Sequence, residues 1–329
     1  MKKMLLGAVG AVALMMSSNG AKAMDELTVA YFPEWPMPFQ YAQKNGIYDE
    51  ALGVKVNWVS FDAGTAMSAA MASGDVQIAV SMGVTPFLTA VSAGQDIQAV
   101  DVAVGYSDND NCVVRESLEI DASNANELEG KQVGVPLGTA AHTGFLAQME
   151  HFGVDTSTME IVDMAPVDSA AAFASGNLDM VCGWGGPLRR MKEYGNPLLV
   201  GAEKESIVGK VYDVTAVDGS WAAENADLVA RFLHLTHDMN RQYNEGRRDD
   251  MLPDIATQAG MDLDGATATA STFVFPSVEE QLSDAWLGGF MATNFKEATD
   301  KRAESGEITA LDSYEGAINA SYLQAASQL

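Results

Sequence analysis

Basic residues are scarce in this sequence. Only 19 Lys and Arg stand against 45 Asp and Glu among 329 residues, which gives a formal net charge of −26. Nucleic-acid and anionic-lipid partners require a surface rich in Lys and Arg, so this deficit argues against both. The hydrophobic share of 47% is nevertheless typical of a globular protein, and the length predicts about two domains.

Motifs of common catalytic and metal sites are also missing. The chain has no G-x-S-x-G, H-E-x-x-H, G-x-x-x-x-G-K-[ST] or strand-led G-x-G-x-x-G pattern. His234 and His237 share a predicted helix face, but no third metal ligand accompanies them. Residues 108–111 resemble the start of a calcium loop, yet Val113 stands where that loop requires glycine, so we interpret them as a polar turn. We therefore predict no catalytic residue, cofactor or metal ion.

Long hydrophobic runs are absent except at the start of the chain. Lys2 and Lys3 precede an apolar stretch from Leu5 to Met16, and Ala21-Lys22-Ala23 provides a cleavage site of A-x-A type. This pattern predicts a secretory signal peptide over residues 1–23, with a retained membrane anchor as the alternative. Cleavage near Ala23 removes three lysines and no acid, which changes the net charge from −26 to −29. We expect a soluble product exported to the periplasm.

Cysteine is nearly absent, since the chain contains only Cys112 and Cys182. Both lie in apolar, strand-like runs. An oxidising compartment permits a disulfide between them, whereas two separate buried thiols are the alternative. The sequence leaves both open, because the spacing does not show whether the two Cα atoms come within reach of each other.

What the sequence does contain is a regular alternation of short apolar strands and helical segments. This alternation is typical of βαβ units and a largely parallel sheet. The predicted strands are 27–32, 54–61, 76–81 and 211–218, and the predicted helices between them are 39–48, 64–73 and 86–93. After residue 221 the pattern is helical, over 223–243, 251–260, 279–296 and 311–328, so we expect this tail to pack on the preceding lobes.

One segment is repeated. Residues 69–80, AAMASGDVQIAV, return 102 positions later as residues 171–182, AAFASGNLDMVC. Each copy reads as a helix end, a glycine cap and a buried strand, followed by a glycine-containing turn and a proline. This repeat favours two similar α/β lobes, although any two βα units share some likeness.

Two turns that open helices are candidate anion sites. They are the run from Ser81 and Met82 to Thr85, before a helix expected to start at Pro86, and the run Gly138–Thr143, which includes Thr139, Ala140 and His142. Helix N-termini offer unpaired N–H groups and the positive end of the helix dipole. The alternative is ordinary capping by Ser and Thr.

Aromatic and acidic residues provide the complementary chemistry. Glu34 and Trp35 follow the first strand, Trp184 follows the repeated strand, and Asp213 begins the predicted return strand. An aromatic face and a carboxylate are what an ammonium group requires. For Trp35 and Trp184, core packing is the alternative.

Several runs of the sequence resemble one known family. The likeness is strongest over residues 55–245 and rests on FDAG at 61–64, ASGDVQI at 72–78, LEGK at 128–131, VGVP at 133–136, EIV at 160–162 and GNLD at 176–179. Together with Pro136, His142, Trp184 and Asp213, these runs resemble the periplasmic taurine and aliphatic-sulfonate binding proteins of ABC importers.

The resemblance implies an α/β, two-lobe periplasmic-binding-protein fold of type II with two hinge crossings and a helical C-terminal tail. Lobe 1 would comprise 24–107 plus 218–329, and lobe 2 would comprise 108–217. The implied sulfonate ligands are Ser81, Thr85, Thr139 and Ala140, and the implied amine ligands are Asp213 and Trp184. Glu34 and Trp35 depart from the small polar residues usual in the family's first loop, and they favour a cationic nitrogen in the ligand.

The resemblance further implies a monomeric, non-enzymatic binding protein that delivers taurine or a similar small amino-sulfonate to a membrane permease and its ATPase. One alternative is a sensory binding subunit. Another is a binder of a different zwitterion or an alkanesulfonate. A third is an enzyme of the same fold related to pyrimidine-precursor synthases, for which His142 would be the candidate base.

Overall fold

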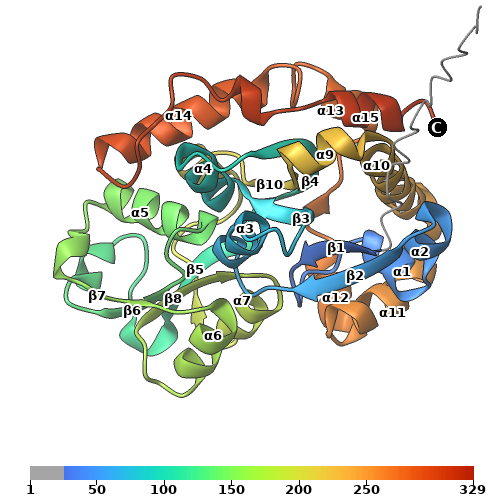
Figure 1. Ribbon diagram of the computed structural model, residues 1–329. Helices are drawn as coiled ribbons and strands as arrows, with labels where there is room; N and C mark the ends of the chain where they lie inside the picture. The colour runs from blue at the N-terminus through green and yellow to red at the C-terminus, as the bar shows by residue number, and fades with distance from the viewer. Residues whose placement is uncertain (1–25) are drawn as a thin grey trace, which may run out of the picture.

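The strands form two separate sheets. The computed structural model describes residues 26–329, so the predicted signal peptide lies outside the described residues. The six-stranded sheet has the order β11-β4-β10-β3-β1-β2, and the five-stranded sheet has the order β7-β6-β8-β5-β9 (Figure 1). The strands are β1 Glu26–Tyr31, β2 Lys55–Ser60, β3 Ile78–Gly83, β4 Ile97–Tyr106, β5 Asp110–Arg115, β6 Gln132–Val135, β7 Glu160–Asp163, β8 Met180–Trp184, β9 Gly195–Asn196, β10 Tyr212–Asp218 and β11 Phe273–Val274.

Helices connect and cover these sheets. They are α1 Phe39–Lys44, α2 Ile47–Leu52, α3 Gly64–Ala72, α4 Val84–Ser92, α5 Ala140–Phe152, α6 Pro166–Ala174, α7 Gly185–Met191, α8 Gly201–Val208, α9 Gly219–Glu224, α10 Ala226–Gln242, α11 Arg248–Ala259, α12 Leu263–Ala270, α13 Val278–Leu282, α14 Phe290–Glu304 and α15 Ser321–Ala326. The predicted α/β class is confirmed, because β1, β2 and β3 pair in parallel, as do β6, β7 and β8.

The chain crosses between the sheets twice. It leaves the six-stranded sheet after β4 and returns to it at β10, which inserts antiparallel between β3 and β4. The first crossing follows the end of β4 at Tyr106. The second predicted boundary, at 217 and 218, falls at the far end of β10, whereas the whole strand pairs within the six-stranded sheet. The return crossing therefore precedes Tyr212.

The repeated segment folds the same way in both copies. Each copy begins in the last turn of a nine-residue helix, α3 or α6. A C-cap serine follows the helix, and then Gly74 or Gly176 adopts the left-handed region at φ 82° and 85°. Each then enters a central strand, β3 or β8, that has one parallel and one antiparallel neighbour. The two lobes therefore share this unit of helix, glycine and strand, as the repeat predicts.

Several predicted boundaries were wrong. Strand β3 continues to Gly83 and α4 begins at Val84, so Pro86 is the third helical residue and not the first. Asp108 and Asn109 form a turn as predicted, but Asp110 and Asn111 open strand β5 and are buried, so the polar turn is shorter than the predicted 108–111. The single helices expected over 39–48 and 279–296 are each two helices, because Gly46 and the turn 283–289 interrupt them.

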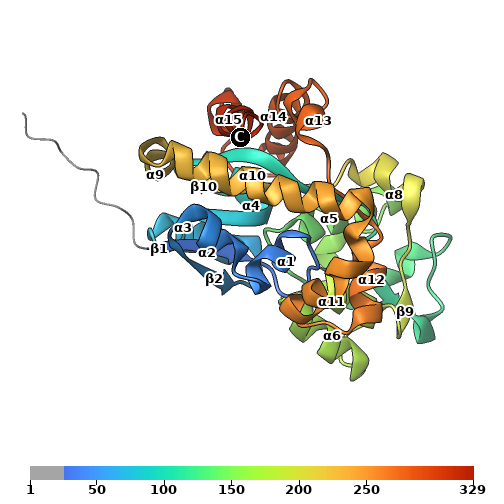
Figure 2. The same ribbon diagram turned by 90° about the vertical axis from the view of Figure 1, so that its right-hand side faces the viewer.

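The C-terminal tail packs on the lobes, as expected. Helices α13, α14 and α15 lie along one side of the six-stranded sheet, and α14 reaches past α4 toward α5 of the other lobe (Figures 1 and 2). Lys301 of α14 pairs with Glu150 of α5 at 3.0 Å. Helices α11 and α12 pack against α1 and α7, so the tail contacts both lobes. No helix within residues 26–329 is both long and apolar enough to cross a membrane.

Cys112 and Cys182 form a disulfide, which decides between the two alternatives that the sequence leaves open. The two residues are direct cross-strand partners on β5 and β8. The bridge closes a long loop, with 70 positions separating the two cysteines, and it fixes the strand pair at the centre of the five-stranded sheet.

Candidate functional site

A small cavity lies between the two sheets. The space between its lining atoms, part of which is open to solvent, measures about 320 Å³. Both lobes contribute to its wall, which is formed by Phe32, Trp35, Gly64, Gly83, Pro86, Tyr106, Asp110, Thr139, Ala140, Trp184 and Asp213. Five of the ten residues predicted for the site are in this set: Trp35, Thr139, Ala140, Trp184 and Asp213.

Asp213 is a buried carboxylate with two fixed donors. It lies near the start of β10 and is only 2% exposed. Its two oxygens accept hydrogen bonds from Ser81 Oγ and from the Tyr106 hydroxyl, each at 2.6 Å. Burial raises the pKa of Asp213 to about 7, the two hydrogen bonds oppose that rise, and the charge of Asp110 adds to it. The group is oriented by the protein and titrates near neutral pH.

Asp110 is a second buried carboxylate on the same cavity, and the sequence analysis missed it. It is the first residue of β5, and burial raises its pKa to about 7 while Lys204 opposes the rise. Lys204 Nζ donates to the backbone carbonyls of Asp110 and Ser107 at 2.5 and 2.7 Å. Within residues 26–329 no donor hydrogen-bonds the Asp110 carboxylate itself, whose pKa is governed by burial and by the charge of Lys204 alone. Both of its oxygens therefore remain available to a ligand.

The two carboxylates lie beside the ends of corresponding strands in the two lobes, one register position apart. Asp213 on β10 is the antiparallel partner of Gly83, the last residue of β3. Asp110 on β5 is the antiparallel partner of Trp184, the last residue of β8. The repeated strands β3 and β8 thus each end beside an acid that lines the same cavity.

Aromatic rings surround these acids. The centroids of Phe32 and Trp184 lie 5.9 Å apart across the cleft, with planes inclined at 54°. On the other side, Trp35 meets Tyr106 edge to face at 4.9 Å. Aromatic faces attract cations, and carboxylates add charge and hydrogen-bond acceptors. The described lining contains no Lys or Arg, so this part of the cavity suits a cationic group.

Three helices begin at the cavity. They are α3 at Gly64, α4 at Val84 and α5 at Ala140, and their first N–H groups lack intrahelical acceptors. A Cβ on Gly64 would lie 2.6 Å from Pro86 Cγ, so only glycine permits the starts of α3 and α4 to approach this closely. The start of α3 also faces α5, because Thr65 Cγ2 lies 3.4 Å from the Cβ position of Gly138. These N-termini provide partial positive charge for an anion without any basic side chain.

The predicted hydroxyl ligands are used within the protein. Ser81 Oγ accepts a hydrogen bond from Trp35 Nε1 at 2.9 Å while it donates to Asp213, and Ser81 itself adopts φ 64°. Thr139 Oγ1 donates to the carbonyl of Pro136 at 2.6 Å and caps α5. Neither Ser81 nor the fully buried Met82 is in the cavity lining. Any anion bound here therefore depends chiefly on backbone N–H groups.

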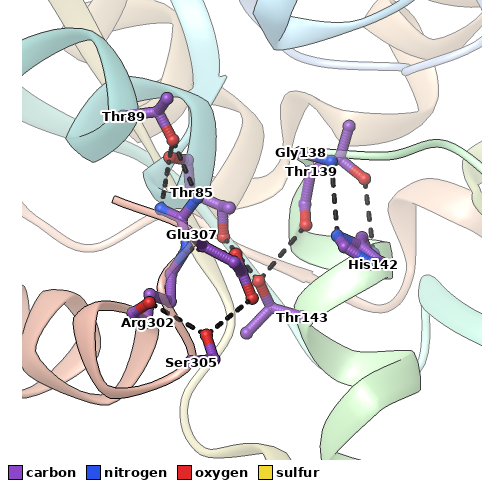
Figure 3. A network of polar contacts seen from close by, with 9 residues as sticks. All are labelled: Thr85, Thr89, Gly138, Thr139, His142, Thr143, Arg302, Ser305 and Glu307. Atoms are coloured by element: carbon purple, nitrogen blue, oxygen red, sulfur yellow. Dashed lines mark hydrogen bonds and ion pairs between the residues drawn. The ribbon is translucent and has the colours of Figure 1, made fainter. Parts of the chain in front are cut away.

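Thr85 and His142 belong to a polar network beside the cavity (Figure 3). The hydroxyls of Thr85 and Thr143 lie 3.2 Å apart and join α4 to α5 of the other lobe. Arg302 of α14 supports this contact, since it donates to the Thr85 carbonyl at 3.3 Å. His142 Nδ1 accepts from the Gly138 N–H at 3.4 Å, and burial lowers the pKa of its ring. The structure places both residues at a lobe contact and not in the lining.

Glu34 also lies outside the cavity lining. Its carboxylate forms a two-pronged ion pair with Arg190 of α7, in the opposite lobe. Its carbonyl accepts the Gly186 N–H at 3.2 Å, and its own N–H donates to the Ala259 carbonyl at 2.8 Å. The loop after β1 thus closes against α7, which makes Glu34 a contact between lobes.

The lining residues that the sequence analysis missed have recognisable positions. Phe32, Tyr106 and Asp110 each lie at the end or start of a strand next to a lobe crossing or a helix-opening loop. That position singled out Asp213 and Trp184, but residues 97–106 were not predicted as a strand, so nothing marked Tyr106 as a strand end. Asp110 was hidden by the neighbouring Asp108 and Asn109, which make the segment look like an exposed turn. No group of three or more His, Cys, Asp or Glu side chains in the described part of the chain is arranged to hold a metal ion.

Comparison with known proteins shows similarity in sequence and in fold to proteins that bind taurine or alkanesulfonates. The chain is 27% identical to the taurine-binding periplasmic protein of Escherichia coli K12 over 217 residues, a match that spans 66% of each protein. Its fold superposes on an alkanesulfonate-binding protein of Xanthomonas axonopodis pv. citri, solved with MOPS, with a TM-score of 0.73, 16% identity and coverage of 90% of this chain and 98% of that one. The periplasmic aliphatic sulphonate binding protein of Escherichia coli gives a TM-score of 0.68 at 18% identity, covering 88% and 95%.

These structural neighbours confirm the two-lobe periplasmic-binding-protein fold predicted from the sequence. At the level of sequence, a family model described as NMT1/THI5 like matches residues 36–238, which is more than half of the chain. This protein belongs to the NMT1/THI5-like family.

Proposed function

We propose that this protein is the solute-binding component of an ABC importer and that it holds taurine or a similar small amino-sulfonate between its two lobes. The observation that carries the proposal is the pairing of Asp110 and Asp213 across one cavity at which three helices also begin. The similarity to a taurine-binding periplasmic protein supports the same ligand class.

In the proposed complex the ammonium group of the ligand lies between the two carboxylates. Asp110 accepts its hydrogen bonds directly, whereas Asp213 supplies charge from an orientation already fixed by Ser81 and Tyr106. The rings of Trp184 and Tyr106 flank the nitrogen. The sulfonate lies against the facing first turns of α3 and α5, where N–H groups lack intrahelical partners.

This arrangement also explains how a protein with a net charge of −26 binds an anionic group. The helix N-termini supply a local positive potential at the sulfonate, and the two acids compensate the ammonium. A ligand with both charges matches the site better than a bare anion, because a bare sulfonate would leave two buried carboxylates without a cation.

The mechanism is lobe closure and involves no covalent step. The ligand contacts both lobes, so it stabilises the closed state in which Glu34 meets Arg190 and Thr85 meets Thr143. The closed form then docks on a membrane permease with its ATPase. We propose that the chain acts as a monomer in the periplasm after cleavage near Ala23, with lobe boundaries near 107 and before Tyr212. His142 does not line the cavity, which favours binding over the enzymatic alternative.

Isothermal titration calorimetry of the mature chain tests the proposal. The ligand set is taurine, ethanesulfonate, which lacks the amine, and ethylamine, which lacks the sulfonate. We expect taurine to bind at least about a hundredfold more tightly than either fragment, since each fragment leaves one half of the site uncompensated. Equal binding of taurine and ethanesulfonate, or no binding of taurine, would contradict the proposal.

A further inference from the structure

Trp35 is held in place by contacts from both lobes. The preceding residue, Glu34, adopts φ 52° and is fixed by backbone hydrogen bonds to Ala259 and to Gly186. Its side chain is paired with Arg190 of α7. The loop that carries Trp35 is therefore anchored to the C-terminal tail on one side and to the other lobe on the other.

The indole ring itself is packed on several sides. Trp35 is 2% exposed, and its ring centroid lies 4.4 Å from that of Phe273 and 4.9 Å from that of Tyr106. Its Nε1 donates to Ser81 Oγ, which in turn donates to Asp213. Rotation of the ring would break this chain of hydrogen bonds and both aromatic contacts.

This fixed ring is a wall of the cavity beside Asp213. It also leaves no gap toward lobe 2, since a Cβ on Gly185 would lie 3.1 Å from Trp35 Cε3 and 2.6 Å from the Glu34 carbonyl oxygen. Gly185 adopts φ 58°, so glycine is required there by conformation as well as by space. The nitrogen end of the cavity is therefore closed by a large side chain that has no room to move.

We propose that Trp35 sets the upper size limit of the ligand at its nitrogen end. The inference rests on the proposed function. It goes further by assigning selection among amino-sulfonates to one residue: the ring accepts a primary ammonium on a two-carbon spacer and excludes longer spacers. Overpacking of a rigid site is costly because neither Tyr106 nor Phe273 can yield without disturbing the lobe core.

The test measures dissociation constants for three ligands that differ only in spacer length: taurine, 3-aminopropanesulfonate and 4-aminobutanesulfonate. We expect the unaltered protein to lose about tenfold in affinity or more for each added methylene. In the Trp35→Ala variant the ratio between the longest and the shortest ligand falls to within about threefold of unity, because the vacated ring volume admits the longer spacer.

Three further variants separate size from other effects. Trp35→Phe keeps a ring but loses the hydrogen bond to Ser81, and we expect it to retain most of the length discrimination. Trp35→Leu gives a second reduction in size if the alanine variant is too unstable to assay. Trp58→Ala removes another Trp of the same lobe, which stacks on Phe39 at 5.3 Å and lies outside the cavity, and it should leave the length ratio unchanged.

The outcomes distinguish this inference from the proposed function. An unaltered protein without length preference, or an unchanged ratio in Trp35→Ala, would overturn the role of Trp35. If the protein binds no amino-sulfonate, the proposed function fails, and the same length comparison is made with alkanesulfonates and ω-amino acids of two to four carbons. If the ligand length that binds most tightly increases in Trp35→Ala, in whichever series binds, the size limit is supported. No binding in any series overturns both proposals.

Discussion

Each lobe has an aspartate beside the end of its repeated strand, but the two acids are in different states. Asp213, opposite the end of β3, already has two hydroxyl donors at 2.6 Å. Asp110, opposite the end of β8, has no donor within residues 26–329 on its carboxylate, although Lys204 holds its backbone. Two similar acids at the ends of repeated strands can therefore have different roles. The protein holds the Asp213 carboxylate in a fixed orientation, and the Asp110 carboxylate is left open for a ligand.

The lobes also differ in how their equivalent strand pairs are joined. In lobe 2 the pair β5–β8 is cross-linked by Cys112 and Cys182, whereas the equivalent pair β10–β3 relies on hydrogen bonds and packing. For a loop of this length the bridge contributes about 4 kcal/mol to the free energy of unfolding. The double variant Cys112→Ser/Cys182→Ser should lower the melting temperature by roughly 10 °C in a calorimetric scan.

If this loss is confined to lobe 2, hydrogen exchange should rise in β5 to β8 and remain low in β1 to β4. A uniform increase of exchange over both sheets would contradict the prediction that the bridge stabilises lobe 2 alone.

The division of work between the two acids predicts unequal mutants. Asp110→Asn should weaken taurine binding by about a hundredfold, because it removes the negative charge that faces the ammonium in a buried site and replaces one acceptor oxygen by an NH2 donor. Asp213→Asn should cost less, about tenfold, since the amide oxygen can keep one of the two hydrogen bonds and the amide NH2 can donate to the other hydroxyl. Calorimetry provides the measurement, and the exposed Asp264→Asn is the matched control for net charge. A larger effect at Asp213 would mean that Asp213, and not Asp110, contacts the ammonium directly.

The raised pKa values predict a pH dependence of binding. Both carboxyls have a pKa of about 7 in the ligand-free protein, so each is largely protonated at pH 6 and ionised at pH 8. An ammonium ligand favours the ionised form, and binding should release a proton and tighten by roughly tenfold from pH 6 to pH 8. Titrations in two buffers of different ionisation enthalpy count the protons, and Asp110→Asn should reduce that count. An affinity that falls from pH 6 to pH 8 would contradict this prediction.

The same groups affect the stability of the ligand-free protein in the opposite direction. Their pKa values are raised above the ordinary 3.8, so their contribution to folding is greatest below that value. It is lost as the pH rises from about 4 to 7, since ionisation in a buried site is unfavourable. Asp110→Asn and Asp213→Asn should each flatten the dependence of the melting temperature on pH over this window. An unchanged slope would show that these carboxyls are not the buried acids.

The smallest effect is expected at the contact between the lobes. Arg190→Ala removes the partner of Glu34, but its side chain is 37% exposed, so the ion pair contributes little. We expect ligand affinity to fall by about threefold or less, mainly through faster dissociation, which stopped-flow fluorescence measures. The neighbouring Arg189→Ala is the control, because its pair with Asp262 is more exposed and longer, at 3.4 Å. Equal effects of both variants would argue against a closing role for Glu34.

Much of this architecture could be predicted from the sequence because it depends on local patterns. The repeat at residues 69–80 and 171–182 contains its own helix ends, glycine caps and buried strands, and these fold as expected. Asp213 and Trp184 could be predicted for the same reason, since Asp213 lies at the start and Trp184 at the end of a recognisable strand. Whether Cys112 meets Cys182 depends on the register of β5 against β8, which no local pattern contains.

The errors at the site come from small shifts with large consequences. Ser81 lies in an irregular part of β3, at φ 64°, where its hydroxyl donates to Asp213, and the next residue, Met82, lies in the core. Glu34 was expected to face the ligand, but its partner Arg190 is 156 positions away and visible only in three dimensions. Asp110 was missed because burial of an acid at a lobe crossing has no signature in composition.

A crystal structure of the mature protein with taurine is the most direct test of the central claim that the paired acids bind the nitrogen. We expect the ligand nitrogen to lie within hydrogen-bond distance of the Asp110 carboxylate, with Asp213 on its other side. The sulfonate should lie against the first turns of α3 and α5. A ligand in the reverse orientation, with the sulfonate beside the two acids, or bound outside this cavity, would contradict it.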